Sequence, residues 1–299
     1  MSERNLALWA AAASGVLVGA AIVATRFVVA EVPPLTLAML RYAVGFFCLL
    51  PFMAGAAWSS IDGGKPLFAR KDLVPIALLG MGQFATLIAL LNFGLKYVGA
   101  AQAALIFSLF PLLTLLLSAL LGHERVSARL SGGVALSILG VGVALAPRLD
   151  AAHSGTGSNG WWGELAVFAS ACVGAVCSVL YRPYLRRYPP VHVSGFAMLA
   201  SVALLCLLAL NEGWPARLPA MSAPAWWTVA FIGVNSGVGY FFWLYALKHE
   251  SPTRVTMFLA LNPVTAALLA VPFLGEPLTA WTVAAIGLIA GGLWLATRG

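Results

Sequence analysis

The sequence carries the same pattern of landmarks twice. Seven charged, proline or glycine positions of the first half recur in order in the second half at a nearly constant distance. The offset is 156 residues for Arg26, Pro33 and Pro34, which recur as Arg182, Pro189 and Pro190. It is 152 residues for Lys96, Pro111, Glu124 and Gly140, which recur as Lys248, Pro263, Glu276 and Gly292. If each copy holds an odd number of membrane helices, the two copies face opposite ways in the bilayer.

The composition places the chain in lipid. Of its 299 residues, 61% are hydrophobic and only 9% are charged, and the mean hydropathy is +0.93. This leaves too little polar surface to coat a soluble globule. A membrane helix needs about 20 mostly apolar residues, and ten stretches meet this requirement. They are residues 6–26, 35–55, 73–94, 100–121, 127–147, 161–181, 191–210, 224–247, 253–273 and 279–297.

We therefore predict an all-α membrane protein with ten transmembrane helices, arranged as two inverted five-helix repeats. The first repeat covers residues 1–149, the second covers residues 161–299, and the Gly- and Ser-rich residues 150–160 form the linker. The first stretch also resembles a secretory signal, but nine further apolar spans favour a retained helix. Gly133, Ser137 and Gly140 share one face of the fifth span, which indicates close packing within the bundle or dimerisation.

The positive charges predict the orientation. The net charge of +7 does not indicate nucleic-acid binding, because the basic residues follow the predicted topology. If the N-terminus is cytoplasmic, 12 of the 17 Lys and Arg residues fall on the cytoplasmic side and four on the other. The 12 are Arg4, Lys65, Arg70, Lys71, Arg125, Arg129, Arg182, Arg186, Arg187, Lys248, Arg254 and Arg298. Both termini are thus predicted to be cytoplasmic.

Two prolines mark candidate hinges. Pro111 and Pro263 lie at equivalent places in the fourth and ninth spans, where each removes a backbone hydrogen bond. Bent helices at matching positions of two repeats point to a central transport site. A static kink that only shapes the bundle is the alternative.

The segments FSLFPLLTLLLSALLGHERVSA (107–128) and FLALNPVTAALLAVPFLGEPLTA (258–280) resemble the proline-to-glutamate stretch near the end of each half in EamA-type carriers of the drug/metabolite transporter superfamily. The opening of the second half, WGELAVFASACVGAVCSVLYR (162–182), is similar to that family's second repeat. Within the superfamily the chain is most similar to YddG-type bacterial exporters of aromatic amino acids. This resemblance implies a bacterial inner membrane protein that exports Phe, Tyr, Trp or related amino acids through a central cavity.

A carrier for such zwitterions needs apolar surface for the side chain and hydrogen-bonding groups for the ammonium and carboxylate ends. Polar and aromatic residues on the third, fourth, eighth and ninth spans supply both. Polar amides in lipid can instead hold helices together, and Tyr and Trp also gather at membrane interfaces. The candidates for substrate binding are Gln83, Phe84, Asn92, Gln102, Asn235, Tyr240, Trp243, Tyr245 and Asn262.

Two charged residues complete the candidate site. Arg41 lies inside the second span, where it either contacts a substrate carboxylate or extends toward the headgroups or a neighbouring loop. Glu164 opens the sixth span after Trp161 and Trp162 and is the candidate for proton coupling. Alternatively, it is an acid stabilised by the helix dipole in a first turn.

Other classes of protein fit less well. The four histidines, His123, His153, His192 and His249, are predicted in loops or at helix ends, and no acid pair lies in the middle of a span, so we predict no enzyme. No charge ring or repeated filter loop indicates a channel. No ATP-binding loop is present, and we expect no cofactor and no metal. A carrier of the same fold for drugs or another metabolite is the remaining alternative. The sequence does not define the oligomeric state, and a monomer is plausible.

Overall fold

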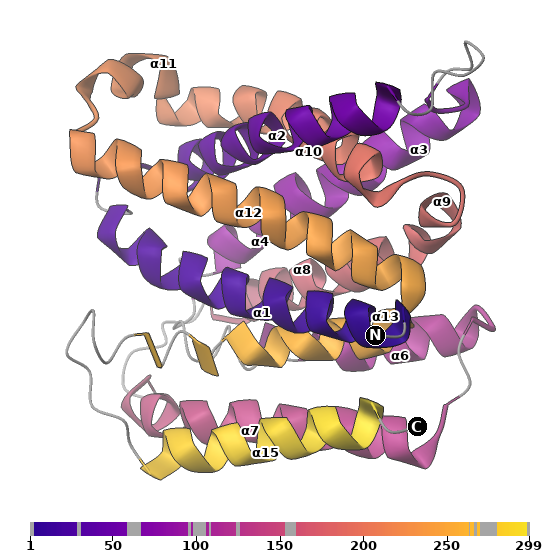
Figure 1. Cartoon of the computed structure of the whole chain (residues 1–299). Coiled ribbons are helices and arrows are strands. Elements are labelled where there is room, and N and C mark those ends of the chain that lie inside the picture. Colours follow the sequence, from indigo (N-terminus) through magenta and orange to yellow (C-terminus); the bar gives the residue numbers. More distant parts are fainter. Residues whose placement is uncertain are drawn as a thin grey trace.

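The computed structural model describes residues 3–28, 31–58, 67–94, 97, 106–107, 109–123, 126–152, 160–262, 264–265, 268–269 and 280–297. The described residues fold as a bundle of helices that lie roughly along one direction (Figure 1). In the first half these are α1 (Glu3–Val28), α2 (Pro34–Trp58), α3 (Arg70–Gly80), η1 (Met81–Thr86), α4 (Leu87–Gly94), α6 (Phe110–Leu120) and α7 (Ala128–Ala152).

The second half supplies a similar series of long helices joined by short ones. Its elements are α8 (Gly160–Leu180), α9 (Arg182–Leu185), α10 (Pro190–Ala209), η2 (Leu210–Glu212), α11 (Trp214–Arg217), η3 (Leu218–Ala220), α12 (Ala223–His249), α13 (Pro252–Met257), η4 (Phe258–Ala260) and α15 (Ala280–Thr297). Pro34 and Pro190, which the duplication pairs, each form the first residue of a long helix. This is the position where a proline costs least, because its missing N–H has no partner inside the helix.

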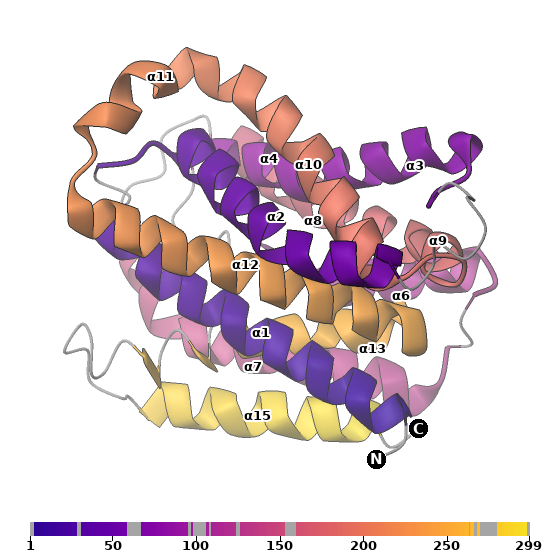
Figure 2. The same ribbon diagram turned by 45° about the horizontal axis from the view of Figure 1, so that its top comes forward.

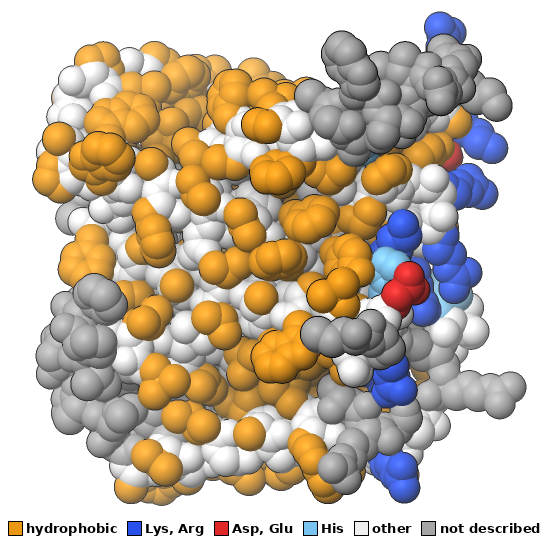
Figure 3. Space-filling view, viewed as in Figure 1, with side chains coloured by type: hydrophobic (Ala, Val, Ile, Leu, Met, Phe, Trp, Pro, Cys, Tyr) orange, Lys and Arg blue, Asp and Glu red, His pale blue; other side chains and the backbone are white. Residues whose placement is uncertain are grey.

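Most of the predicted apolar stretches form helices in the described part of the chain, and not all of these helices have spanning length. Among the described residues, six helical stretches are long and apolar enough to cross a membrane, and three shorter apolar helices accompany them. Large apolar side chains are exposed on the outside of the bundle and cover much of the face seen in Figure 3. An aqueous surface rarely exposes so much contiguous apolar area. Examples are Trp9, Phe47, Phe52, Leu120 and Trp227.

Some boundaries differ from the predicted ones. α6 begins at Phe110, so Pro111 lies in its first turn and not in the interior of a continuous helix. α7 continues through Ala152, so Asp150, Ala151 and Ala152 of the predicted linker are helical. Residues 153–159 lie outside the described residues. The third predicted span contains a six-residue π-helix, η1, between α3 and α4.

Helices at equivalent places in the two halves pack against each other and run antiparallel. In the pair of α2 and α10, Thr36 near the start of α2 bonds Glu212 beyond the end of α10. At the other end of this pair, His192 Nε2 near the start of α10 lies 3.1 Å from the carbonyl oxygen of Met53 late in α2. α7 and α15 lie side by side in both ribbon views (Figures 1 and 2). They also run in opposite directions.

Small residues set the close approach of α7 and α15. An added Cβ at Gly140 would lie 3.0 Å from Ile289 N, and one at Gly292 would lie 2.9 Å from Ser137 N. Gly140 and Gly292 are 152 residues apart, and so are Ser137 and Ile289. The two contacts are therefore related to each other by exchange of the two halves. The small-residue face of the fifth predicted span is used for packing within the bundle.

We expect Gly292→Ala to lower the free energy of unfolding by about 1 kcal/mol, the low end of the cost of overpacking. Its Cβ would lie 2.7 Å from Gly133 O, a backbone atom that moves only if α7 and α15 separate. Gly287→Ala on the same helix is the matched control, because no atom lies within 4 Å of its added Cβ. Thermal unfolding of the detergent-solubilised variants measures the difference. Equal unfolding midpoints would show that this contact is not close-packed.

Charged side chains are segregated toward one end of the bundle. The Lys, Arg and His side chains visible in Figure 3 lie along its right edge. That end holds α9 and the starts of α1, α3 and α13 (Figure 1). We call it the basic end; its described basic residues include Arg4, Arg70, Lys71, Arg186, Arg187, Lys248 and Arg254. The opposite end holds α11 and the start of α12.

Candidate functional site

Four aromatic side chains from both halves meet inside the bundle. Tyr42 of α2 lies 4.5 Å from Phe84 of η1, measured between ring centroids, and Phe84 lies 4.2 Å from Tyr240 of α12. The ring of Tyr181, which follows α8, lies 6.4 Å from that of Tyr240. All four are buried, and their tilted or edge-to-face arrangements are those that aromatic rings prefer. We call these residues the aromatic cluster.

Polar atoms beside the rings lack hydrogen-bond partners. Gln83 Oε1 is buried and forms no hydrogen bond with another described residue. The buried hydroxyl groups of Tyr181 and Tyr240 face each other, and neither forms a hydrogen bond of ordinary geometry with a described residue. A buried polar group without a partner is costly and rare, so each one calls for an explanation such as a bound ligand or water. Gln83 also lies in the π-helix η1, and such segments occur frequently at functional sites.

Arg41 borders the aromatic cluster. Its Nε donates a hydrogen bond of 3.0 Å to Ser236 Oγ of α12, and its guanidinium carbon lies 5.2 Å from the ring centroid of Tyr42. The side chain therefore joins α2 to the middle of α12, and this contact is not the loop contact considered from sequence. The distance to Tyr42 is within the range of a cation–π interaction.

Cys177 is adjacent to the cluster. It is buried one turn before Tyr181, whose backbone N–H donates to its carbonyl oxygen. An added Cβ at Gly82 of η1 would lie 2.9 Å from its sulfur atom. Glycine at position 82 thus lets α8 approach the π-helix closely. A single buried thiol with apolar neighbours packs as a small apolar group.

Among the remaining predicted site residues, Trp243 belongs to the buried apolar core that holds the aromatic cluster. Asn235 donates from Nδ2 to the carbonyl oxygen of Leu17 at 2.7 Å, so it holds α12 to α1. Trp243 is buried one turn after Tyr240. Tyr245 packs 4.7 Å from His249, near the end of α12. Asn92 is half-buried on α4.

The other candidates lie away from the cluster or outside the described residues. Asn262 Oδ1 is buried without a hydrogen-bond partner among the described residues, close to α1. Glu164 is exposed and is the fifth residue of α8, beyond its first turn. Gln102 and Pro263 lie outside the described residues.

Tyr42 and Tyr181 were not among the residues predicted for the site. Tyr42 and Tyr181 lie directly beside Arg41 and Arg182, and an aromatic residue next to a charge near a span end is typical of a membrane interface. Ser236 shares a helix face with Tyr240. The sequence shows this spacing, which places Ser236 beside the predicted site residues of the eighth span.

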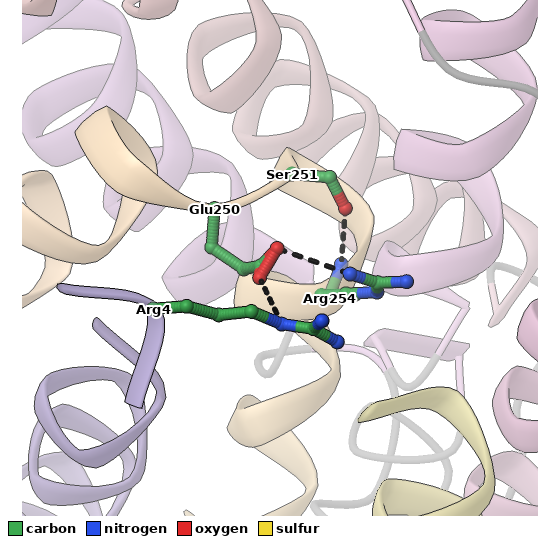
Figure 4. Close-up of polar contacts among 4 residues, drawn as sticks. All are labelled: Arg4, Glu250, Ser251 and Arg254. Atoms are coloured by element: carbon green, nitrogen blue, oxygen red, sulfur yellow. Dashed lines mark hydrogen bonds and ion pairs between the residues drawn. The ribbon is translucent and has the colours of Figure 1, made fainter. Parts of the chain in front are cut away.

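Polar contacts tie helices together at the basic end. The Tyr188 hydroxyl donates to Asp72 Oδ2 at 2.6 Å, and Arg187 Nη1 lies 3.5 Å from the same oxygen. We call this the basic-end contact; it fastens the loop before α10 to the first turn of α3. The hydrogen bond to Asp72 raises the pKa of Tyr188 above its ordinary value. A second group, drawn in Figure 4, joins Glu250 to Arg254 at 3.1 Å and to Arg4 at 3.8 Å.

The opposite end is held by two carboxylates. Glu31 accepts hydrogen bonds from the backbone N–H and the hydroxyl of Ser222, the residue that caps α12. We call this the opposite-end contact. Glu212 accepts from Leu35 N at 3.0 Å, Thr36 N at 2.7 Å and Thr36 Oγ1 at 2.8 Å. These donors belong to the first turn of α2, where backbone N–H groups have no partner inside the helix.

The two end contacts are equivalent in the duplication. Glu31 and Arg187 are 156 residues apart, and each lies in the loop that precedes an equivalent helix, α2 or α10. Glu31 contacts the start of α12, and Arg187 contacts the start of α3, the corresponding helix of the first half. The chemistry differs: a carboxylate accepts from a helix cap at one end, and a guanidinium and a phenol hold a carboxylate at the other.

These features define a class of protein. Apolar helices of membrane-spanning length, exposed apolar side chains and a partly polar cluster buried between the halves are those of a multi-pass membrane transporter. The chain belongs to the EamA-like transporter family, whose model matches residues 5–146 and again residues 161–298.

Individual relatives are transporters by name. The chain is 30% identical to a "Probable terminal-alkyne amino-acid exporter" of Streptantibioticus cattleyicolor, over 82% of this chain and 80% of that one. It is 28% identical to "Aromatic amino acid exporter YddG" of Ancylobacter novellus, over 89% and 88% of the two chains. An uncharacterized transporter of Archaeoglobus fulgidus is 27% identical over 94% of each chain. A solved crystal structure with 25% sequence identity superimposes with a TM-score of 0.80 over 99% of this chain and 98% of that one.

Proposed function

We propose that this protein exports amino acids with aromatic or other hydrophobic side chains, by alternating access through the region of the aromatic cluster. The observation that carries this proposal is the cluster itself. Rings from α2 and η1 of the first half meet rings of α12 and Tyr181 of the second half beside unpaired polar atoms. Rings suit an apolar side chain, and the unpaired atoms suit the polar groups of an amino acid. The names of the relatives support the same class of cargo.

Alternating access follows from ten helices arranged as two inverted repeats. The equivalent helices α2 and α10 pack antiparallel, and so do α7 and α15. This packing supports the arrangement, because it implies a pseudo-twofold axis that relates the two halves and lies across the helices. Such an axis lies in the plane of a membrane that the helices span. One repeat can then adopt the conformation of the other, which opens the site first to one side and then to the other.

The hinges and the orientation complete the proposal. We assign hinge roles to Pro111, at the start of α6, and to its counterpart Pro263. We place the protein in a bacterial inner membrane with the basic end and both termini in the cytoplasm, because Lys and Arg residues are enriched on the cytoplasmic side of membrane proteins. Substrate would enter from the basic end and leave at the end held by Glu31 and Glu212.

Counterflow in proteoliposomes tests the cargo. Vesicles loaded with unlabelled Phe, Trp, Thr or Met are placed in the same labelled amino acid, and its accumulation is followed. We expect saturable exchange of Phe and Trp, reduced about tenfold in Tyr240→Ala, because one aromatic contact beyond its buried area contributes up to about 1.4 kcal/mol. Trp227→Ala on the same helix is the control, because this side chain is 78% exposed.

Protein folding is checked by size-exclusion chromatography, and Tyr240→Phe separates the ring from its hydroxyl group. Equal exchange by Tyr240→Ala and wild type would remove the cluster from the transport site. Absence of exchange for every amino acid in a folded preparation would contradict the cargo and favour a drug or another metabolite.

A further inference from the structure

Arg41 is a charge inside a membrane-spanning helix with little to neutralise it. It is the eighth residue of α2, two turns from Pro34. A guanidinium stays protonated in proteins and carries five N–H donors. Its only hydrogen bond to a described residue uses Nε, and no described carboxylate lies within ion-pair distance of it. Charges inside a membrane are costly and usually serve a function.

Four of the described carboxylates already have partners at the two ends of the bundle. Asp72 and Glu250 bind Tyr188, Arg187 and Arg254 at the basic end. Glu31 and Glu212 cap the starts of α12 and α2 at the opposite end. Within the described part of the chain, the carboxylate that would complete the surroundings of Arg41 therefore does not come from the protein.

The present partner of Arg41 is a weak one. Ser236 Oγ donates its single proton to the carbonyl oxygen of Ile232 at 2.6 Å, so toward Arg41 it acts only as a neutral acceptor. A carboxylate is a stronger acceptor and binds a guanidinium through two parallel hydrogen bonds.

The position of Arg41 fixes what else the carboxylate must carry. Its guanidinium lies 5.2 Å from the centre of the Tyr42 ring, which contacts Phe84 and through it Tyr240. A molecule whose carboxylate binds Arg41 can therefore place an aromatic or aliphatic group among these rings. Gln83 Oε1, on the residue next to Phe84, is an unpaired acceptor suited to an ammonium group.

We propose that Arg41 binds the carboxylate of the substrate in place of Ser236, so that the carrier selects apolar molecules with a free carboxylate and rejects amides, amines and lipophilic cations. This inference rests on the proposed function and names the chemical group that the transport site recognises. Like-charge repulsion from Arg41 provides the rejection of cations.

Competition against labelled Phe counterflow tests the inference. The unlabelled competitors are Phe, phenylalaninamide, 3-phenylpropionate and phenethylamine, which keep the ring and differ in the carboxylate and ammonium groups. For wild type we expect Phe to compete at a concentration at least about tenfold lower than its amide, as a charge-assisted bidentate contact implies. We expect 3-phenylpropionate to compete better than phenethylamine.

Arg41→Gln should reduce this preference for Phe over its amide to near one, and Arg41→Lys should keep part of it. Arg186→Gln is the control, because Arg186 is an exposed basic residue outside the cluster. If Arg41→Gln fails to fold, the wild-type competition series and Arg41→Lys still decide. Equal competition by Phe and its amide in wild type would overturn this inference and leave the proposed function intact. Absence of any Phe exchange by folded wild type would overturn both.

Discussion

Loss of the basic-end contact is expected to open that end of the bundle, and loss of the opposite-end contact is expected to open the other. Asp72→Ala removes the acceptor that the Tyr188 hydroxyl and Arg187 share. Glu31→Ala removes the acceptor of both Ser222 donors. Each variant leaves the other contact intact. The duplication relates the two contacts, but they lie at opposite ends of the bundle. The loss of each contact should therefore favour opening at its own end.

Cys177 is a natural reporter for this experiment. Its thiol is buried beside the aromatic cluster, so it reacts with a membrane-impermeant maleimide only when water reaches the site. In a background with Cys48, Cys172 and Cys206 replaced by alanine, labelling is measured in inside-out and right-side-out vesicles. We expect Asp72→Ala to speed labelling from the basic end, and Glu31→Ala from the opposite end, each on the order of tenfold.

The control for this experiment is Glu3→Ala, which removes an 85% exposed side chain whose ion pair with His249 spans 3.8 Å. Such an exposed pair contributes little, so labelling should stay at the wild-type rate from both sides. Acceleration of the same side by Asp72→Ala and Glu31→Ala would contradict separate roles for the two contacts.

Glu212→Ala is expected to lower the free energy of unfolding by about 2 kcal/mol. The half-buried carboxylate accepts three hydrogen bonds from the first turn of α2. The positive end of that helix dipole also stabilises its negative charge. Its loss leaves the Leu35 and Thr36 N–H groups without their partner. Thermal unfolding in detergent measures the change.

Glu212→Gln is the matched variant for this prediction. Its amide keeps one acceptor oxygen and the length of the side chain but loses the charge, so its unfolding midpoint should lie between those of wild type and Glu212→Ala. If all three proteins unfold at the same temperature, Glu212 does not hold α2 to the end of α10.

The long apolar helices of the described residues were predictable because a membrane span needs a long apolar run, which is visible in the composition of each segment. The start of α2 at Pro34 and of α10 at Pro190 follow from proline chemistry that the sequence displays. The π-helix at Met81–Thr86 was not predictable, because the insertion of an extra residue into a turn depends on the packing of neighbouring helices. The fifth span was predicted to end at residue 147, whereas α7 continues to Ala152.

The candidate site was predictable only in part. Phe84 and Tyr240 were chosen as apolar surface for a substrate, and they do lie together. Asn235 met the same sequence criteria, yet its amide bonds the Leu17 carbonyl. A polar side chain in a span serves a site or another helix depending on which helix lies opposite. That information belongs to the tertiary fold, and it also explains why Tyr42 and Tyr181 were not chosen.

We propose that the region of the aromatic cluster opens alternately to both sides of the membrane. The most direct test uses the protein that keeps Cys177 as its single cysteine and carries no other substitution. The impermeant maleimide is added to each side of the membrane in turn, with and without saturating Phe, and the rate of Cys177 labelling is measured. We expect Cys177 to react from both sides and Phe to change both rates. Labelling from one side only, or from neither, in a preparation that exchanges Phe would contradict this proposal.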